Sequence, residues 1–103
     1  MSVKWGPVPA QVTIYTTAWC SFCRRAKRLL TEKNAAFTEI DVEGRPDLRS
    51  FLKSASGQHT VPQVFINGES LGGYSELAAL DQRGDLDRLL GAPSPADLPA
   101  LPT

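Results

Sequence analysis

Cys20 and Cys23 are the two cysteines of this 103-residue chain, and they are separated by Ser21 and Phe22. The alternating run Val12–Tyr15 precedes them, and a helical pattern begins directly after them. A thiolate is the reactive form of cysteine, and the N-terminus of a helix stabilises negative charge. Cysteines at positions i and i+3 around such a turn can also form a disulfide with each other. The pattern therefore predicts dithiol redox chemistry.

Zinc binding is the main alternative for a C-x-x-C pair. A zinc ion takes four protein ligands, or three and a water molecule. The chain offers two cysteines and one distant histidine, His59. We therefore favour redox chemistry and expect no resident metal. We interpret His59 as a bystander, because a loop histidine acts less often as a general base than as a surface residue.

The overall composition predicts one small domain. Hydrophobic residues make up 42% of the chain and charged residues 21%, values that are ordinary for globular proteins. No apolar run approaches the length of a membrane span, so we expect no contact with a membrane. The first ten residues contain no secretory signal, which favours the cytoplasm. A structural disulfide is unusual in that compartment, which favours a redox-active or metal-binding pair.

Positive charge follows the cysteines closely, at Arg24, Arg25, Lys27 and Arg28. This cluster is either the solvated face of a helix or a local field that stabilises a thiolate and attracts anionic substrates. The net charge of the chain is zero, and aromatic residues make up 8%. The cluster is too local, and the aromatic residues too few, to predict nucleic-acid binding.

Hydrophobic periodicity and turn residues predict the elements that position the cysteines. The first strand, helix and strand have short connections, which implies a parallel pair of strands. Asn67-Gly68 predicts a two-residue hairpin and hence an antiparallel pair. The expected elements are a strand at 12–16, a helix at 21–33, a strand at 37–42, a helix at 46–55, strands at 63–66 and 69–71, a helix at 74–80 and a short helix at 85–90.

This order, with C-x-x-C at the start of the first helix, is typical of a thioredoxin-like α/β fold. We expect a four-stranded mixed sheet flanked by helices. The predicted domain spans residues 11–90 and follows an irregular lead-in at residues 1–10. Residues 91–103 contain four prolines, which exclude regular structure. We expect this tail to be disordered or to rest on the surface.

Two further segments carry candidate binding residues. Pro62 is either a simple strand-entry proline or part of a cis Val61-Pro62 bond that leaves the Val61 backbone free to pair with an extended peptide. Gly72-Gly73 precedes a helix whose N-terminus could bind a carboxylate. In this segment Ser75 would either cap the helix or donate to a bound anion. A glycine-rich turn with an N-cap explains the same residues equally well.

Three motifs in register resemble the glutaredoxins, specifically the small bacterial dithiol kind. The resemblance covers about residues 11–90. The matching segments are Tyr15-Thr16, Cys20–Lys27, Thr60–Ile66 and Gly72-Gly73, with Ala79–Asp81 and Gly84 behind them.

The resemblance implies a glutathione-dependent thiol-disulfide oxidoreductase. In this family pattern Cys20 is the nucleophile and Cys23 the resolving thiol. Its partners would be glutathione and proteins that carry disulfides or mixed disulfides with glutathione, and the apo protein would be a monomer. Glutathione would be flanked by Phe22 and held along its backbone by Thr60 and Val61 beside cis-Pro62. The implied residues for its carboxylates are Gly73, Tyr74 and Ser75 at the γ-glutamyl end and Arg49 at the glycine end.

Two positions depart from the family pattern. Many glutaredoxins have a lysine where this chain has Thr17, and that lysine helps to bind glutathione and lowers the pKa of the nucleophilic thiol. Its role would pass to Arg49, the helix dipole and Arg24. Ser21 stands where proline is common, which frees one N–H. Some glutaredoxins with a similar Trp-Cys-Ser-aromatic sequence bind a [2Fe-2S] cluster, which bridges two subunits through the first cysteine and glutathione. An alternative function is therefore a cluster-binding dimer with Cys20 as ligand.

Overall fold

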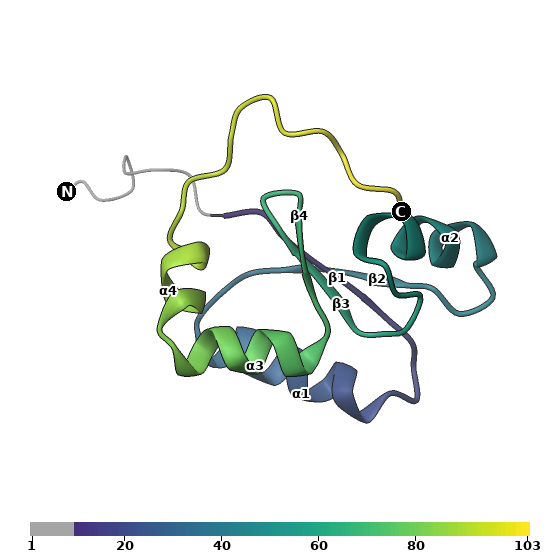
Figure 1. Ribbon diagram of the computed structural model, residues 1–103, viewed down its shortest axis with the longest axis horizontal. Coiled ribbons are helices and arrows are strands. Elements are labelled where there is room, and N and C mark those ends of the chain that lie inside the picture. The colour runs from purple at the N-terminus through teal and green to yellow at the C-terminus, as the bar shows by residue number, and fades with distance from the viewer. Residues whose placement is uncertain (1–9) are drawn as a thin grey trace.

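A mixed four-stranded sheet lies at the centre of the computed structural model, which describes residues 10–103 (Figure 1). The expected lead-in at residues 1–10 lies outside the described residues, apart from Ala10. The elements are β1 (Val12–Thr16), α1 (Ser21–Glu32), β2 (Thr38–Asp41), α2 (Pro46–Ser56), β3 (Gln63–Ile66), β4 (Glu69–Gly72), α3 (Tyr74–Gln82) and α4 (Asp85–Leu90). All the elements expected within these residues are present, with ends shifted by at most two residues.

The strands lie in the order β2-β1-β3-β4. β1 pairs with β2 in parallel, and β3 pairs with β1 and β4 in antiparallel. The predicted thioredoxin-like fold is therefore confirmed. The hairpin turn is formed as expected, because Asn67 and Gly68 both have positive φ angles, 51° and 80°.

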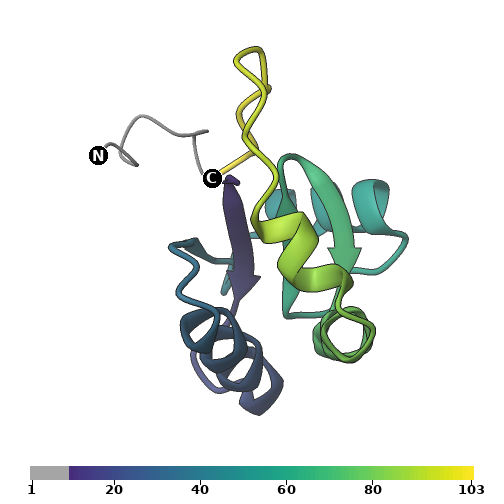
Figure 2. The ribbon, with the colours of Figure 1, turned by 90° about the vertical axis from the view of Figure 1, so that its left-hand side faces the viewer.

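Successive side chains along β1 and β3 point to opposite faces of the sheet, so the core has two halves, one on each face. Ile14 and Val64 face one side of the sheet, where they pack with α1, α3 and α4, while Tyr15 and Phe65 face the other side and pack with α2. Figures 1 and 2 show α1 and α3 together on one side of the sheet and α2 on the other. This arrangement fixes the start of α1 and the start of α3 on the same side of the molecule.

The amphipathic pattern of α1 explains its orientation. Cys23, Ala26 and Leu30 are buried at the three- and four-residue spacing of one helix face. Beyond the helix end, Asn34 takes a left-handed conformation with φ 59°. Lys33, the C-terminal cap, forms ion pairs with Asp81 and with Asp87 of α4, at 2.6 Å and 3.0 Å. These contacts hold the C-terminal end of α1 beside α3 and α4.

The proline-rich tail, residues 91–103, contains neither helix nor strand and lies along the domain. In Figure 1 it runs from α4 past the end of the sheet to α2. Leu101 packs partly buried against the half of the core that contains Tyr15. The Asn67 side-chain amide donates hydrogen bonds to the carbonyl oxygens of Ala92 and Pro93. Among residues 10–103, no helix is both long and apolar enough to cross a membrane.

Candidate active site

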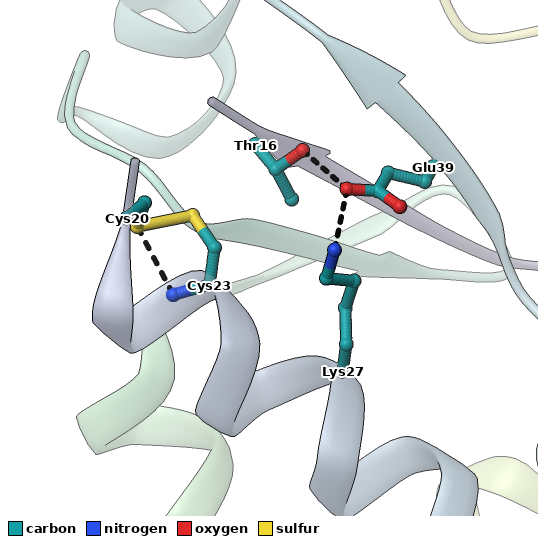
Figure 3. A network of polar contacts seen from close by, with 5 residues as sticks. All are labelled: Thr16, Cys20, Cys23, Lys27 and Glu39. Carbon is teal, nitrogen blue, oxygen red and sulfur yellow. Dashed lines mark hydrogen bonds and ion pairs between the residues drawn. A yellow bond between two sulfur atoms is a disulfide. The ribbon is translucent and has the colours of Figure 1, made fainter. Parts of the chain in front are cut away.

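Cys20 is the N-cap residue of α1, and its backbone is extended, with φ −117° and ψ 109°. The backbone N–H of Cys23 donates a hydrogen bond of 3.0 Å to the Cys20 Sγ (Figure 3). The two cysteines form a disulfide, and their Cα atoms are 5.1 Å apart. In the reduced protein the same N–H would stabilise a Cys20 thiolate, as a helix N-terminus does for an anion.

The two cysteines differ in their exposure to solvent. Cys23 is only 1% exposed, whereas Cys20 is half-buried at the surface. Two aromatic residues beside Cys20 are exposed to an unusual degree, Trp19 at 95% and Phe22 at 52%. A substrate therefore reaches Cys20 first, and Cys23 is available for a second, internal step.

The Val61-Pro62 peptide bond is cis, which agrees with the second of the two alternatives for Pro62 and with the family resemblance. It places the Val61 carbonyl oxygen 3.9 Å from the Cys20 Sγ. Pro62 itself is buried and leads directly into β3. The backbone at Val61 is thus immediately adjacent to the reactive sulfur.

A groove of about 360 Å³ lies beside this backbone segment. Seven of the candidate glutathione residues line it together, which the spacing along the chain alone did not show. Gln58 and Glu76 also line it and are not among the predicted residues. The predicted lining residues are Phe22, Thr60, Val61, Pro62, Gly73, Tyr74 and Ser75. Phe22 and Tyr74 stack at one end of the groove, with their ring centroids 6.1 Å apart.

The start of α3 forms one wall of the groove. Gly73 is its N-cap residue, so of the two alternatives for Ser75 the helix cap is wrong: Ser75 already lies inside the helix. The Glu76 carboxylate accepts a hydrogen bond of 2.7 Å from the Gly73 N–H. A glutamate three residues after the cap is the known signal for this contact, and it identifies Glu76 from sequence. Tyr74 and Ser75 are the first two residues of the helix, so their N–H groups have no partner within the helix and are available to an anion.

Arg49 is the one candidate glutathione residue that does not line the groove. Its Nη1 donates a hydrogen bond of 2.9 Å to the carbonyl oxygen of His59, next to Thr60. Arg49 lines a neighbouring hollow of about 600 Å³ together with Arg45, Lys53 and His59. The basic side chains of this hollow outnumber the acidic one, Glu43, and Arg49 connects the hollow to the loop that forms the groove.

A cluster of three polar residues, Thr16, Lys27 and Glu39, lies close to the disulfide (Figure 3). The sequence pattern did not predict it. Glu39 of β2 accepts hydrogen bonds from Lys27 Nζ at 2.9 Å and from Thr16 Oγ1 at 2.7 Å. The Lys27 ammonium, and then the Thr16 hydroxyl, hold the pKa of the Glu39 carboxyl below its ordinary value. The three residues lie on β1, α1 and β2, so no motif within a short stretch of sequence predicts that they meet. Within residues 10–103, histidine, cysteine, aspartate and glutamate form no group of three that could hold a metal ion.

The fold and the cysteine pair define a class of protein: a thiol-disulfide oxidoreductase with a thioredoxin-like fold. Comparison with known proteins narrows this class. A model of the glutaredoxin family matches residues 12–71. The chain is 49% identical to a glutaredoxin of Pseudomonas aeruginosa over 81 residues, which cover 79% of this chain and 96% of that protein. It is 46% identical to glutaredoxin 3 of Escherichia coli, again over 81 residues, which cover 79% of this chain and 98% of the relative.

Solved structures agree with this assignment. The crystal structure of a buckwheat glutaredoxin–glutathione complex superimposes with a TM-score of 0.73 at 27% identity, covering 79% of this chain and 76% of that one. The chain therefore belongs to the glutaredoxin family.

Proposed function

We propose that the protein reduces protein disulfides and glutathione mixed disulfides, with glutathione as its thiol substrate. The observation that carries this proposal is the groove beside Cys20, which Thr60, Val61, Tyr74 and Ser75 line. A buckwheat relative, whose structure is a complex with glutathione, supports the choice of ligand. The groove suits an extended peptide because a strand-entry backbone forms one side of it and a helix N-terminus the other.

In this proposal, residues in and beside the groove bind the two ends of glutathione. The N–H groups of Tyr74 and Ser75 at the start of α3 would bind the γ-glutamyl carboxylate. The backbone of Val61 would pair with the peptide, and Thr60 would flank it. Arg49 would turn from the His59 carbonyl oxygen to the glycine carboxylate, which makes a stronger, charge-assisted hydrogen bond. The glutathione sulfur would then lie next to Cys20.

The chemistry begins at Cys20. Its thiolate attacks one sulfur of a glutathionylated protein, a new disulfide forms between Cys20 and glutathione, and the protein thiolate leaves and takes a proton. The Cys23 N–H, 3.0 Å from the Cys20 Sγ, stabilises the thiolate before attack. Thr17 lines the hollow beside Cys20 and Cys23, so no lysine at this position adds to that stabilisation.

Two routes can release the enzyme from the mixed disulfide. In the monothiol route a second glutathione thiolate attacks the glutathione sulfur, and Cys20 leaves. In the dithiol route Cys23 attacks the Cys20 sulfur, the Cys20–Cys23 disulfide closes and glutathione leaves. Because Cys23 is buried, it can attack the adjacent Cys20 sulfur but not an external disulfide, so it acts only in the second route.

Two cysteine variants test the assignment. Cys20→Ser should lose essentially all reduction of a glutathionylated peptide, because no other thiolate lies at the surface of the site. Cys23→Ser should keep most of this activity and lose the reduction of protein disulfides. Full activity of the Cys20→Ser protein would refute the proposal.

Binding can be tested apart from chemistry with S-methylglutathione, which cannot form a disulfide. NMR titration of the Cys20→Ser protein should give saturable shifts at Thr60, Val61, Tyr74 and Ser75. Shifts confined to other surfaces, or no saturation, would leave the protein an oxidoreductase that does not use glutathione. A thioredoxin-like protein that is reduced by a reductase would then be the better description.

The second candidate function is a [2Fe-2S] carrier, and one observation favours it. Trp19 is 95% exposed directly before Cys20, so it offers an apolar surface at the point where two subunits would meet. Cys20 and one glutathione from each of two chains supply four ligands, and the Cys20–Cys23 disulfide must first be reduced. Anaerobic reconstitution with iron, sulfide and glutathione should then give a coloured dimer. A colourless monomer would exclude this function.

A further inference from the structure

A hollow of about 260 Å³ adjoins the disulfide and shares no lining residue with the proposed glutathione groove. Its walls come from the segment after β1, from α1 and from β2. Both cysteines line it together with four charged residues. The full lining is Thr16, Thr17, Ala18, Cys20, Cys23, Arg24, Lys27, Glu39 and Asp41.

The charged residues of this hollow are held in a fixed arrangement. Lys27 follows Cys23 by one helical turn, which puts both side chains on one face of α1. The Lys27 Nζ and the Thr16 Oγ1 both bond to the same oxygen of Glu39, at 2.9 Å and 2.7 Å (Figure 3). The side chains of Lys27 and Glu39 are 31% and 39% exposed, so the pair is partly shielded from solvent. A cation and an anion therefore share the hollow with the least exposed thiol of the protein.

The charged groups that line the hollow are Arg24 and Lys27 of α1 and Glu39 and Asp41 of β2. Asp41 is engaged by the chain itself, because its Oδ1 accepts a hydrogen bond of 2.9 Å from the Glu43 N–H. Arg24 is exposed, whereas Lys27 is half-buried. Among residues 10–103, Lys27 is thus the less exposed of the two cations that line the hollow, and Glu39 is the anion that bonds to it.

We propose that Lys27 and Glu39 are opposed positioning residues for Cys23: Lys27 stabilises its thiolate, and Glu39 fixes the Lys27 ammonium and limits that stabilisation. The step they control is the attack of the Cys23 thiolate on the sulfur of Cys20 in a mixed disulfide. A Cys20–Cys23 bond forms, the bond from Cys20 to the substrate sulfur breaks, and the substrate leaves as a thiolate that takes a proton. Cys23 is oxidised and the substrate sulfur is reduced.

The inference concerns any substrate thiol and does not depend on glutathione. Two variants should change the ionisation of the Cys23 thiol in opposite directions. A merely structural role of Lys27 and Glu39 would not have this effect. Lys27→Met removes the cation and leaves Glu39 unbalanced, so the Cys23 thiol should be harder to ionise. Glu39→Gln removes the anion and leaves Lys27 unbalanced, so the same thiol should ionise more easily. The double variant Lys27→Met/Glu39→Gln should lie close to the parent protein.

The first experiment titrates Cys23 in a Cys20→Ser background, where it is the single thiol. Ultraviolet absorbance of the thiolate, with NMR of the Cys23 Cβ as a second probe, gives the midpoint of ionisation. We expect Lys27→Met to raise this midpoint by about one pH unit and Glu39→Gln to lower it by about one unit. Lys27→Arg, which keeps the cation, should restore the parent midpoint.

Matched controls change the same charges on the exposed surface of α1. Arg28→Met and Glu32→Gln alter the net charge as Lys27→Met and Glu39→Gln do, but neither residue lines the hollow. Their effect on the midpoint should be a small fraction of a unit. The proposal would be overturned if Lys27→Met and Glu39→Gln moved the ionisation midpoint of Cys23 in the same direction. It would also be overturned if they moved the midpoint no further than the controls do. Chemical unfolding of each variant verifies that it is folded.

The second experiment follows closure of the disulfide in the protein that has both cysteines. Cys20 is converted to a mixed disulfide with a small thiol, and release of that thiol is timed by rapid quench. A thiolate that is harder to form is also more nucleophilic, and the two effects partly cancel. A shift of the ionisation midpoint by one pH unit therefore changes the rate of disulfide closure by about threefold rather than tenfold. Lys27→Met should slow closure about threefold at neutral pH, and Glu39→Gln should accelerate it about threefold. Equal rates in all three proteins would contradict the proposed role.

Discussion

The Tyr15 hydroxyl, at the centre of the sheet, donates a hydrogen bond of 2.7 Å to the carbonyl oxygen of Pro102, which lies 87 residues further along the chain. Tyr15 is fully buried, and its ring packs against Phe65 and Phe51 at centroid distances of 5.6 Å and 5.9 Å. A buried hydroxyl needs a partner, because an unpaired one costs about 1–3 kcal/mol. The tail supplies that partner and, with Leu101, covers this half of the core.

Deletion of residues 98–103 should therefore destabilise the domain. The deletion leaves the Tyr15 hydroxyl without Pro102 and uncovers the apolar surface under Leu101. We expect the free energy of unfolding to fall by about 2 kcal/mol, as measured by urea denaturation. Asp97→Ala, an exposed change in the same tail, is the control and should have little effect. An unchanged urea midpoint in the deletion protein would mean that the tail does not stabilise the core.

Short sequence motifs predict where the hairpin turn and the start of α1 lie. Asn67-Gly68 specifies the hairpin because both residues tolerate positive φ, and the C-x-x-C pair specifies a helix start because its first cysteine caps it. The contact between Tyr15 and Pro102 could not be predicted, because it joins distant segments through a side chain and a backbone oxygen. The same holds for Glu39, whose partners lie on β1 and α1. Interactions between elements depend on packing that no short motif encodes.

Ionisation of Tyr15 gives a second prediction. Burial raises the pKa of this hydroxyl above its ordinary value of 10.0. Because the folded protein keeps the proton to a higher pH than the unfolded chain, the contribution of Tyr15 is complete below about pH 10 and is lost as the pH rises through the folded pKa. The free energy of unfolding should thus fall above about pH 10 in the parent protein.

Tyr15→Phe removes this alkaline loss, at a cost of about 1 kcal/mol at neutral pH for the missing hydrogen bond. Urea denaturation at several pH values measures both effects. Tyr74→Phe, at the surface of the groove, is the control and should retain the alkaline loss of the parent. Parallel pH profiles for the parent and Tyr15→Phe would contradict the assignment to Tyr15.

Glu39 gives the corresponding prediction in acid. The Lys27 ammonium, followed by the Thr16 hydroxyl, lowers the pKa of this carboxyl below its ordinary value of 4.5. The stabilisation that results is present above about pH 4.5 and is lost as the pH falls through the folded pKa. Since both side chains are partly exposed, we expect only about 0.5 kcal/mol. Glu39→Gln should flatten the acid limb of the stability profile by this amount, whereas Glu32→Gln should leave that limb unchanged.

The two glycines before α3 give a prediction that separates binding from folding. Gly72 has φ 88°, and a Cβ there would lie 2.9 Å from the Glu76 Cγ. Gly72→Ala should therefore destabilise the fold by about 1–2 kcal/mol, because the left-handed conformation and the contact both oppose it. Gly73 has no such constraint on φ, but a Cβ there would lie 3.2 Å from the carbonyl oxygen of Pro62.

Gly73→Ala should consequently act on the groove more than on stability. The new methyl group presses against the backbone of Pro62, so the start of α3 must move by a few tenths of an ångström away from the residues before β3. We expect binding of S-methylglutathione to weaken about fivefold, which corresponds to about 1 kcal/mol. The rate at which Cys20 reacts with a disulfide lacking glutathione should stay the same, because its N-cap position on α1 is unchanged. A Gly73→Ala protein that binds S-methylglutathione as tightly as the parent would mean that the ligand does not use the gap between Gly73 and Pro62.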